Sequence, residues 1–168
     1  MGIEILKPDI NKSFGKFTVE DGMIRFGLGS IKNVGIQPVD SIIKERETNG
    51  KFENFTDFCE RIYNEQVNKK CVESLIKAGA FDSLGKNRKT LLYSYEQIID
   101  TIQNEHNKDF SNQITMFDVA NDEKDIEKMK YSFSEETEFP EKELLSMEKE
   151  MLGMYISGHP LEKYREKI

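Results

Sequence analysis

The feature that most constrains the fold is the order of residues in FGLGSIKNVGIQPVDSIIKER, residues 26–46. Apolar residues precede a three-residue hairpin, Asn33-Val34-Gly35, and a second apolar pattern follows it. The second pattern has the helical spacing i, i+3, i+4 and i+7, at Val39, Ile42, Ile43 and Arg46. Pro38 suits a first helical turn because its missing N–H would have no partner there. The segment therefore predicts a tight hairpin that leads into a helix, with Asn49-Gly50 as the end of that helix.

This arrangement is the helix-hairpin-helix pattern, and its chemistry suits a phosphate group. A tight hairpin before a helix start leaves backbone N–H groups pointing outward at the positive end of the helix dipole. Such donors bind a phosphate without reading any base. We expect Gly35 to adopt a positive φ, and Asn33 to tolerate the left-handed conformation where the usual pattern has another glycine. The candidate DNA contacts are Lys32, Asn33, Val34 and Gly35; the alternative is an ordinary helix–helix turn.

A second unit of the same plan follows. Asn68 is placed to cap the helix NKKCVESLIKAGA, and the turn GAFDSLG leads into KNRKTLLYSYEQIIDTIQNEHN. The apolar positions expected on one face of each helix are Cys71, Leu75 and Ala78, then Leu91, Tyr95, Ile98 and Ile102. The candidate DNA contacts here are Gly79, Lys86, Arg88 and Lys89, and the alternative is a solvated basic helix start.

The remaining segments complete a mainly α fold. Alternation on both sides of Asp21-Gly22 predicts a short β-hairpin, and FENFTDFCERI predicts a short helix with Thr56 as its cap and Phe55, Phe58, Cys59 and Ile62 buried. A polar stretch without periodicity predicts a flexible linker, and PEKELLSMEKEMLGMYI predicts a last helix with Leu144, Met147, Met151, Leu152 and Tyr155 on its apolar face. The expected segments are 1–27, an extended β-hairpin; 28–106, the tandem helix-hairpin-helix module; 107–139, the linker; and 140–168, the last helix.

The charge is divided unevenly along the chain. The net charge is −7, which by itself argues against a nucleic-acid partner. However, residues 1–92 hold 15 Lys and Arg against 13 Asp and Glu, while residues 93–168 hold 9 against 18. The acidity belongs to the second half, so the first half is free to meet phosphates.

Several classes of protein are disfavoured. No window approaches the roughly 18 uninterrupted apolar residues of a membrane span, and MGIEILKPDIN has no secretory pattern, so a cytoplasmic location is expected. Cys59 and Cys71 predict two reduced thiols, and a zinc site made by them with His106 and His159 is the less favoured alternative. No catalytic constellation or phosphate-binding Walker loop is present, and His159 in SGHPL is interpreted as a turn residue. We therefore expect no catalytic residue, metal or cofactor.

Four stretches together resemble the alpha subunits of bacterial DNA polymerase III. They are MGIEILKPDIN, IRFGLGSIKNVG, NKKCVESLIKAGAFDSLG and LLSMEKEMLGMYISGHPLEKY, in that order. The resemblance covers nearly the whole chain and is weakest across 118–139. It implies a tandem helix-hairpin-helix module that contacts duplex DNA behind the polymerising site. It also implies that the catalytic aspartates lie upstream of residue 1 and that an OB domain follows.

The resemblance gives a meaning to QITMF, residues 113–117. These apolar residues stand in a charged stretch, between the second unit and the SGHPL helix, where the family has its sliding-clamp-binding motif. The implied clamp contacts are Gln113, Met116 and Phe117. The alternative is that Met116 and Phe117 cover the domain's own core.

The sequence thus predicts a non-catalytic piece of a replicative polymerase. Its expected partners are duplex DNA, the sliding clamp (the beta subunit) and the rest of the polymerase chain. One alternative is a freestanding interaction scaffold whose hairpins are only turns. A helix-hairpin-helix DNA repair glycosylase is less favoured, because no Trp and no coherent base pocket are evident.

Overall fold

A small sheet lies at the N-terminal end of the fold. The computed structural model describes residues 4–62, 67–111 and 133–156, so QITMF and His159 lie outside the described residues. Strands β1 (Ile5–Leu6), β2 (Thr18–Glu20) and β3 (Met23–Arg25) form a three-stranded sheet of order β1-β3-β2. Strand β3 pairs antiparallel with β2 and parallel with β1. Asp21 and Gly22 have φ values of 52° and 79°, which confirms the predicted hairpin turn.

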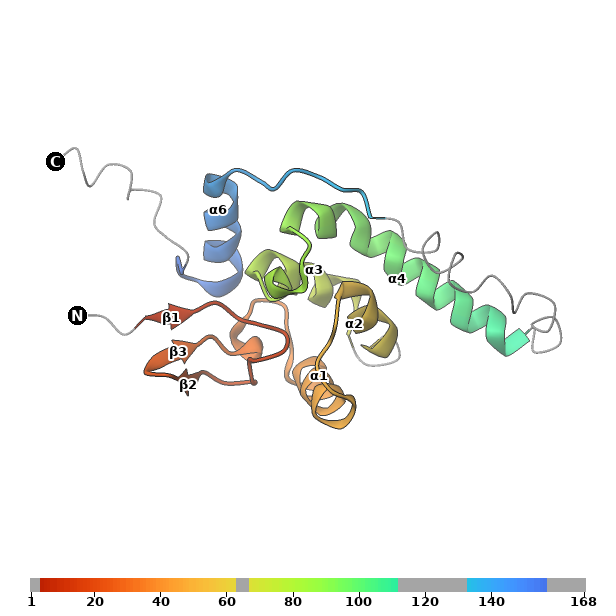
Figure 1. Ribbon diagram of the computed structural model, residues 1–168, viewed down its shortest axis with the longest axis horizontal. Helices are drawn as coiled ribbons and strands as arrows, with labels where there is room; N and C mark the ends of the chain where they lie inside the picture. The colour runs from red at the N-terminus through yellow and green to blue at the C-terminus, as the bar shows by residue number, and fades with distance from the viewer. Residues whose placement is uncertain (1–3, 63–66, 112–132, 157–168) are drawn as a thin grey trace.

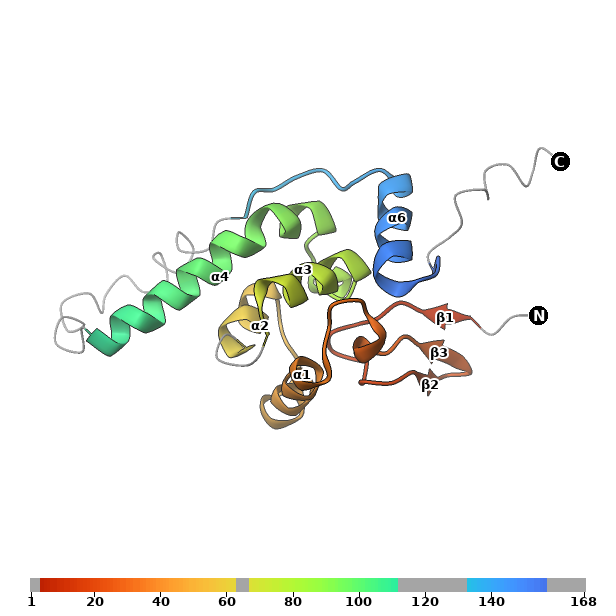
Figure 2. The same ribbon diagram turned by 180° about the vertical axis from the view of Figure 1, so that it is seen from behind.

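The rest of the described chain is mainly helical, as the sequence predicts. The helices are α1 (Ile36–Asn49), α2 (Phe55–Ile62), α3 (Lys69–Ala78), α4 (Arg88–Ser111) and α6 (Glu141–Leu152), with short 3-10 turns η1 (Leu28–Ser30) and η2 (Asp82–Leu84). Helix α4 lies across α3 and extends to one side of the molecule, while α6 stands between the start of α4 and the sheet (Figures 1 and 2).

Local signals account for the ends of these helices. The Asn68 side chain accepts a hydrogen bond from the Cys71 amide at 2.8 Å, as predicted for the cap of α3. Helix α2 is capped by Asn54, whose Oδ1 accepts from the Asp57 amide at 2.7 Å, and not by Thr56. The prediction for Thr56 was wrong because α2 begins at Phe55, before that residue. Gly50 ends α1 with a φ of 87°, as expected.

Four phenylalanines form the centre of the core. Phe52 contacts Phe58, and Phe55 and Phe58 both contact Phe81, in edge-to-face pairs with ring centroids 4.9 to 5.1 Å apart. The predicted apolar faces of α2, α3 and α4 are buried around them: Phe55, Phe58, Cys59, Ile62, Cys71, Leu75, Ala78, Leu91, Tyr95, Ile98 and Ile102. The two helical units therefore share one core.

The linker and the last helix differ from the sequence prediction. Helix α4 continues to Ser111, past the expected boundary at 106. Residues 133–139, placed in the linker by sequence, run along the start of α4 and hydrogen-bond to it.

The buried face of α6 is formed by Leu145, Glu148, Met151 and Leu152. Leu144 and Met147 lie at its half-buried margins. The buried face thus differs from the predicted apolar face. It includes Glu148, whose carboxylate lies 3.6 Å from the guanidinium of the buried Arg88.

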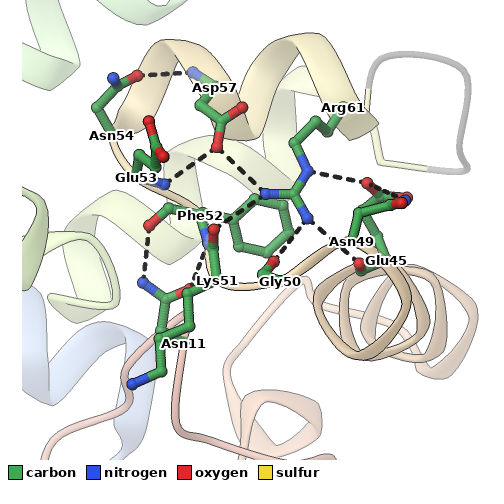
Figure 3. A network of polar contacts seen from close by, with 10 residues as sticks. All are labelled: Asn11, Glu45, Asn49, Gly50, Lys51, Phe52, Glu53, Asn54, Asp57 and Arg61. Atoms are coloured by element: carbon green, nitrogen blue, oxygen red, sulfur yellow. Dashed lines mark hydrogen bonds and ion pairs between the residues drawn. The ribbon is translucent and has the colours of Figure 1, made fainter.

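Arg61 joins the end of α1 to α2 (Figure 3). Its guanidinium donates to Glu45 Oε1 at 2.8 Å, to Asp57 Oδ2 at 3.2 Å and to the Gly50 carbonyl oxygen at 2.7 Å. The same group lies 4.4 Å from the centroid of the Phe52 ring. One side chain thus satisfies the carbonyl groups at the C-terminal end of α1 and covers the core.

We predict that replacing Arg61 with Met destabilises the chain by about 2 kcal/mol, because its charge-assisted hydrogen bonds to the carboxylates of Glu45 and Asp57 and to the Gly50 carbonyl oxygen are lost. Arg61→Lys should recover less than half of this loss, since an ammonium lacks the fork that reaches several acceptors. Urea denaturation measures both values. The exposed Lys44→Ala serves as control and should change the free energy of unfolding by no more than about 0.5 kcal/mol. A lysine variant as stable as the parent chain would contradict this role for the fork.

Candidate nucleic-acid interface

The first hairpin has the left-handed residue at Asn33. Its φ is 66°, as predicted for the residue that stands where the pattern has glycine. The expectation for Gly35 was wrong: its φ is −82° and its ψ 173°, an extended conformation open to any residue. A Cβ at Gly35 would only touch the Pro38 side chain, at 3.5 Å. The reversal of the chain is completed at Asn33, so Gly35 can act as the N-terminal cap of α1.

The start of α1 is open in the way that phosphate binding requires. No side chain caps it, because the cap residue is Gly35. The amides of Ile36 and Gln37 belong to the first turn, which precedes the first intrahelical hydrogen bonds. Lys32, Asn33, Gly35, Ile36 and Gln37 are all exposed, and Ile36 keeps 77% of its surface. Val34 is buried and anchors the hairpin to the core. Of the predicted contacts, Lys32, Asn33 and Gly35 therefore lie together on one surface.

Two neighbouring segments brace this hairpin. The amides of Leu28 and Gly29 donate to the carbonyl oxygens of Phe14 and Gly15, at 2.8 and 3.1 Å. A Cβ at Gly27 or Gly29 would come within 2.6 to 2.8 Å of that backbone, so these two glycines are required for close approach. From the other side, the Lys32 amide donates to the Met151 carbonyl oxygen of α6 at 2.9 Å. Sequence reasoning missed this bracing, although the FGLGS pattern was its signal.

The second hairpin is built around a buried arginine. Arg88 is 3% exposed, and its guanidinium donates to both carboxylate oxygens of Asp82 at 3.2 and 3.0 Å. It also lies 3.6 Å from the Glu148 carboxylate of α6. Burial opposes the charge, but Asp82 and Glu148 raise the pKa of Arg88 above its ordinary value. The predicted DNA contact by Arg88 is corrected accordingly: the side chain joins η2, α4 and α6.

Gly79 serves the same internal arrangement. Its φ of 86° ends α3, and its amide donates to the Ile76 carbonyl oxygen at 3.0 Å. A Cβ there would lie 2.5 Å from an Arg88 guanidinium nitrogen. The guanidinium thus covers Gly79, so the prediction that Gly79 faces DNA is also corrected.

The amide donors at the start of α4 are occupied by side chains of the same chain. Asn87 Oδ1 accepts from the Thr90 amide at 2.8 Å, and the Glu138 carboxylate accepts from the amides of Arg88 and Lys89 at 3.0 and 3.2 Å. Lys86 pairs with Glu135. The two hairpins are therefore not equivalent: the first is open to an anion and the second holds one.

The structure says less about the predicted clamp contacts and the two cysteines. Gln113, Met116 and Phe117 lie outside the described residues. Cys59 and Cys71 are buried free thiols, and burial raises the pKa of Cys71 to about 11. Within the described ranges, no group of His, Cys, Asp and Glu side chains is arranged to hold a metal ion. The described helices include none with the length and apolar character of a membrane span.

These two hairpins on a shared core define a helix-hairpin-helix protein. The chain belongs to that family: the model of the helix-hairpin-helix motif matches residues 2–91.

The chain is also similar to curated proteins named DNA polymerase III subunit alpha. It is 45% identical to that of Borreliella burgdorferi and 38% identical to that of Vibrio cholerae, over 100% of this chain in both cases. It is 41% identical to that of Saccharopolyspora erythraea over 96% of this chain. The matched region is 14 to 15% of each relative, so the chain spans about a seventh of their length. The predicted resemblance is confirmed.

We predict that Asn33→Val costs about 1–2 kcal/mol of folding free energy, whereas Asn33→Gly is neutral or stabilising, because only the branched residue opposes a positive φ. Gly35→Ala is the matched control and should cost less than about 1 kcal/mol, since its backbone conformation is ordinary. Urea denaturation compares all three. A costly Gly35→Ala beside a harmless Asn33→Val would reverse the assignment of the left-handed position.

Proposed function

We propose that this chain is a non-catalytic region of a DNA polymerase III alpha subunit, which holds duplex DNA while the polymerising residues act from elsewhere in the longer protein. Identity to such subunits over the whole chain supports this proposal over a freestanding scaffold or a repair glycosylase. The proposed region works in the cytoplasm and needs no cofactor of its own. Its contribution is to hold the template duplex in place.

The observation that carries the proposal is the open start of α1. An uncapped helix N-terminus presents backbone donors and a positive dipole end to a phosphate. The exposed Lys32 adds a cation beside it, and the exposed Ile36 adds an apolar contact for the sugar. None of these groups distinguishes one base pair from another, so binding is independent of sequence. A single open hairpin neutralises few phosphates, which gives a shallow salt slope of about −1 to −2.

We predict that Gln37→Glu weakens duplex binding by about five- to tenfold, a loss of roughly 1–1.4 kcal/mol. A carboxylate in the first turn of α1 stabilises the helix but repels a phosphate at the same amides. The change therefore separates binding from folding. Fluorescence anisotropy with a labelled duplex measures the affinity, and thermal melting measures the stability.

Gln97→Glu is the matched control, because it adds the same charge at an exposed position in the middle of α4. It should change affinity only slightly. Equal losses in both variants would mean that net charge, and not the first hairpin, governs binding.

We also propose that QITMF binds the sliding clamp, with Gln113, Met116 and Phe117 as its contacts. The support is its sequence: a glutamine followed by a closely spaced apolar pair in a polar segment, as a short linear motif requires. Fixing five residues in one bound conformation offsets much of the gain from burying two side chains. The affinity should be modest, around micromolar. A modest contact is sufficient, because a polymerase already on the DNA meets the clamp at high effective concentration.

We predict that Met116→Ala with Phe117→Ala abolishes clamp binding and leaves the melting temperature almost unchanged. Surface plasmon resonance on immobilised clamp tests the first part and thermal melting the second. Val119→Ala with Met129→Ala removes similar apolar surface outside the motif and should retain binding. A large loss of stability with binding intact would instead assign Met116 and Phe117 to the core.

A further inference from the structure

A short acidic segment covers the start of α4. Residues 133–139, FSEETEF, are called the strap here. The strap begins beside Ser94 of α4, passes the first turn of that helix and continues into α6 (Figure 1). The Ser134 amide donates to Ser94 Oγ at 2.8 Å, and the Glu136 amide donates to Thr90 Oγ1 at 2.9 Å. The Asn87 side chain donates to the Glu136 carbonyl oxygen at 2.7 Å. Backbone contacts thus fix the path of the strap.

The side chains of the strap occupy the groups that a phosphate would use. Glu138 accepts from the first two amides of α4. Glu135 pairs with Lys86, whose ammonium also lies 4.8 Å from the centroid of Phe133. The ammonium of Lys89 lies 5.6 Å from the centroid of Phe139. The strap therefore contacts the side chains of Lys86 and Lys89 and also accepts hydrogen bonds from the first two amides of α4.

The start of α4 thus holds an anionic group of the chain itself, the Glu138 carboxylate. A helix N-terminus flanked by two lysines suits a phosphate, and a glutamate carboxylate satisfies the same donors with less charge. The occupant belongs to the chain, so its local concentration is high and constant. In contrast, no side chain caps the start of α1.

We propose that the strap is an intramolecular competitor of DNA at the second hairpin, so that duplex DNA is held by the first hairpin until the strap is displaced. This inference rests on the proposed DNA binding. Displacement would exchange the Glu135 and Glu138 carboxylates for backbone phosphates on Lys86, Lys89 and the α4 amides. The strap leads into α6, so a pull on α6 from the adjoining polypeptide would act on it directly.

The test is the double variant Glu135→Gln/Glu138→Gln in the 168-residue chain. Glutamine keeps the size of the side chain but cannot compete with a phosphate as an anion. Anisotropy with a labelled duplex should show at least a threefold gain in affinity and a salt slope steeper by about one. Adding Lys89→Ala to this variant should remove most of the gain, and Lys89→Ala in the parent chain should have a smaller effect.

Glu143→Gln/Glu150→Gln is the matched control, because it removes the same charge from exposed positions on α6. It should give little of the gain. Amide chemical shifts supply an independent readout: DNA should perturb Gln37 in the parent chain, and both Gln37 and Lys89 in the strap variant.

The outcomes separate the two proposals. Strap variants that bind no better than the control, or a parent chain in which DNA already perturbs Lys89 as strongly as Gln37, would overturn the competitor. A parent chain that binds no DNA, beside a strap variant that binds through Lys89, would sink the role of the first hairpin and leave the competitor standing. If neither the parent chain nor the strap variant binds DNA, both proposals are wrong.

Discussion

The fold depends most on the burial of one positive charge. Arg88 sits at the meeting point of η2, α4 and α6, where its guanidinium contacts Asp82 and the fully buried Glu148. Taking these charges out of water is costly, and a pair of this kind is balanced only when every partner is in place. Removing one partner would leave an uncompensated charge in the interior. The cluster therefore selects one arrangement of the three elements more than it adds stability.

Helix α6 carries that arrangement from one hairpin to the other. Its Glu148 holds Arg88 at the second hairpin, and one turn later its Met151 carbonyl oxygen accepts the Lys32 amide of the first. Because a helix is stiff over this length, the two hairpins keep a fixed relation through α6 as well as through the shared core. A short helix that sequence alone would describe as an appendage is thus a structural link between the two units.

Local patterns made much of this fold predictable. The faces of α3 and α4 follow from helical periodicity, and the left-handed Asn33 follows from the place of an asparagine in the hairpin. The buried positions of Arg88 and Glu148 could not be predicted, because a charged residue is placed at the surface by default unless its distant partner is known. The position of the strap could not be predicted for the same reason. Its polarity reads as a linker, while its contacts depend on groups at Asn87 and Ser94, some 40 to 49 residues away.

The length of α4 has a mechanical consequence. Its 24 residues span about 36 Å, and QITMF begins two residues after its end. The opposite end of the helix is fixed to the hairpins by Arg88 and the strap. Helix α4 therefore serves as a rigid rod that keeps Ser111, the last described residue before QITMF, far from the second hairpin.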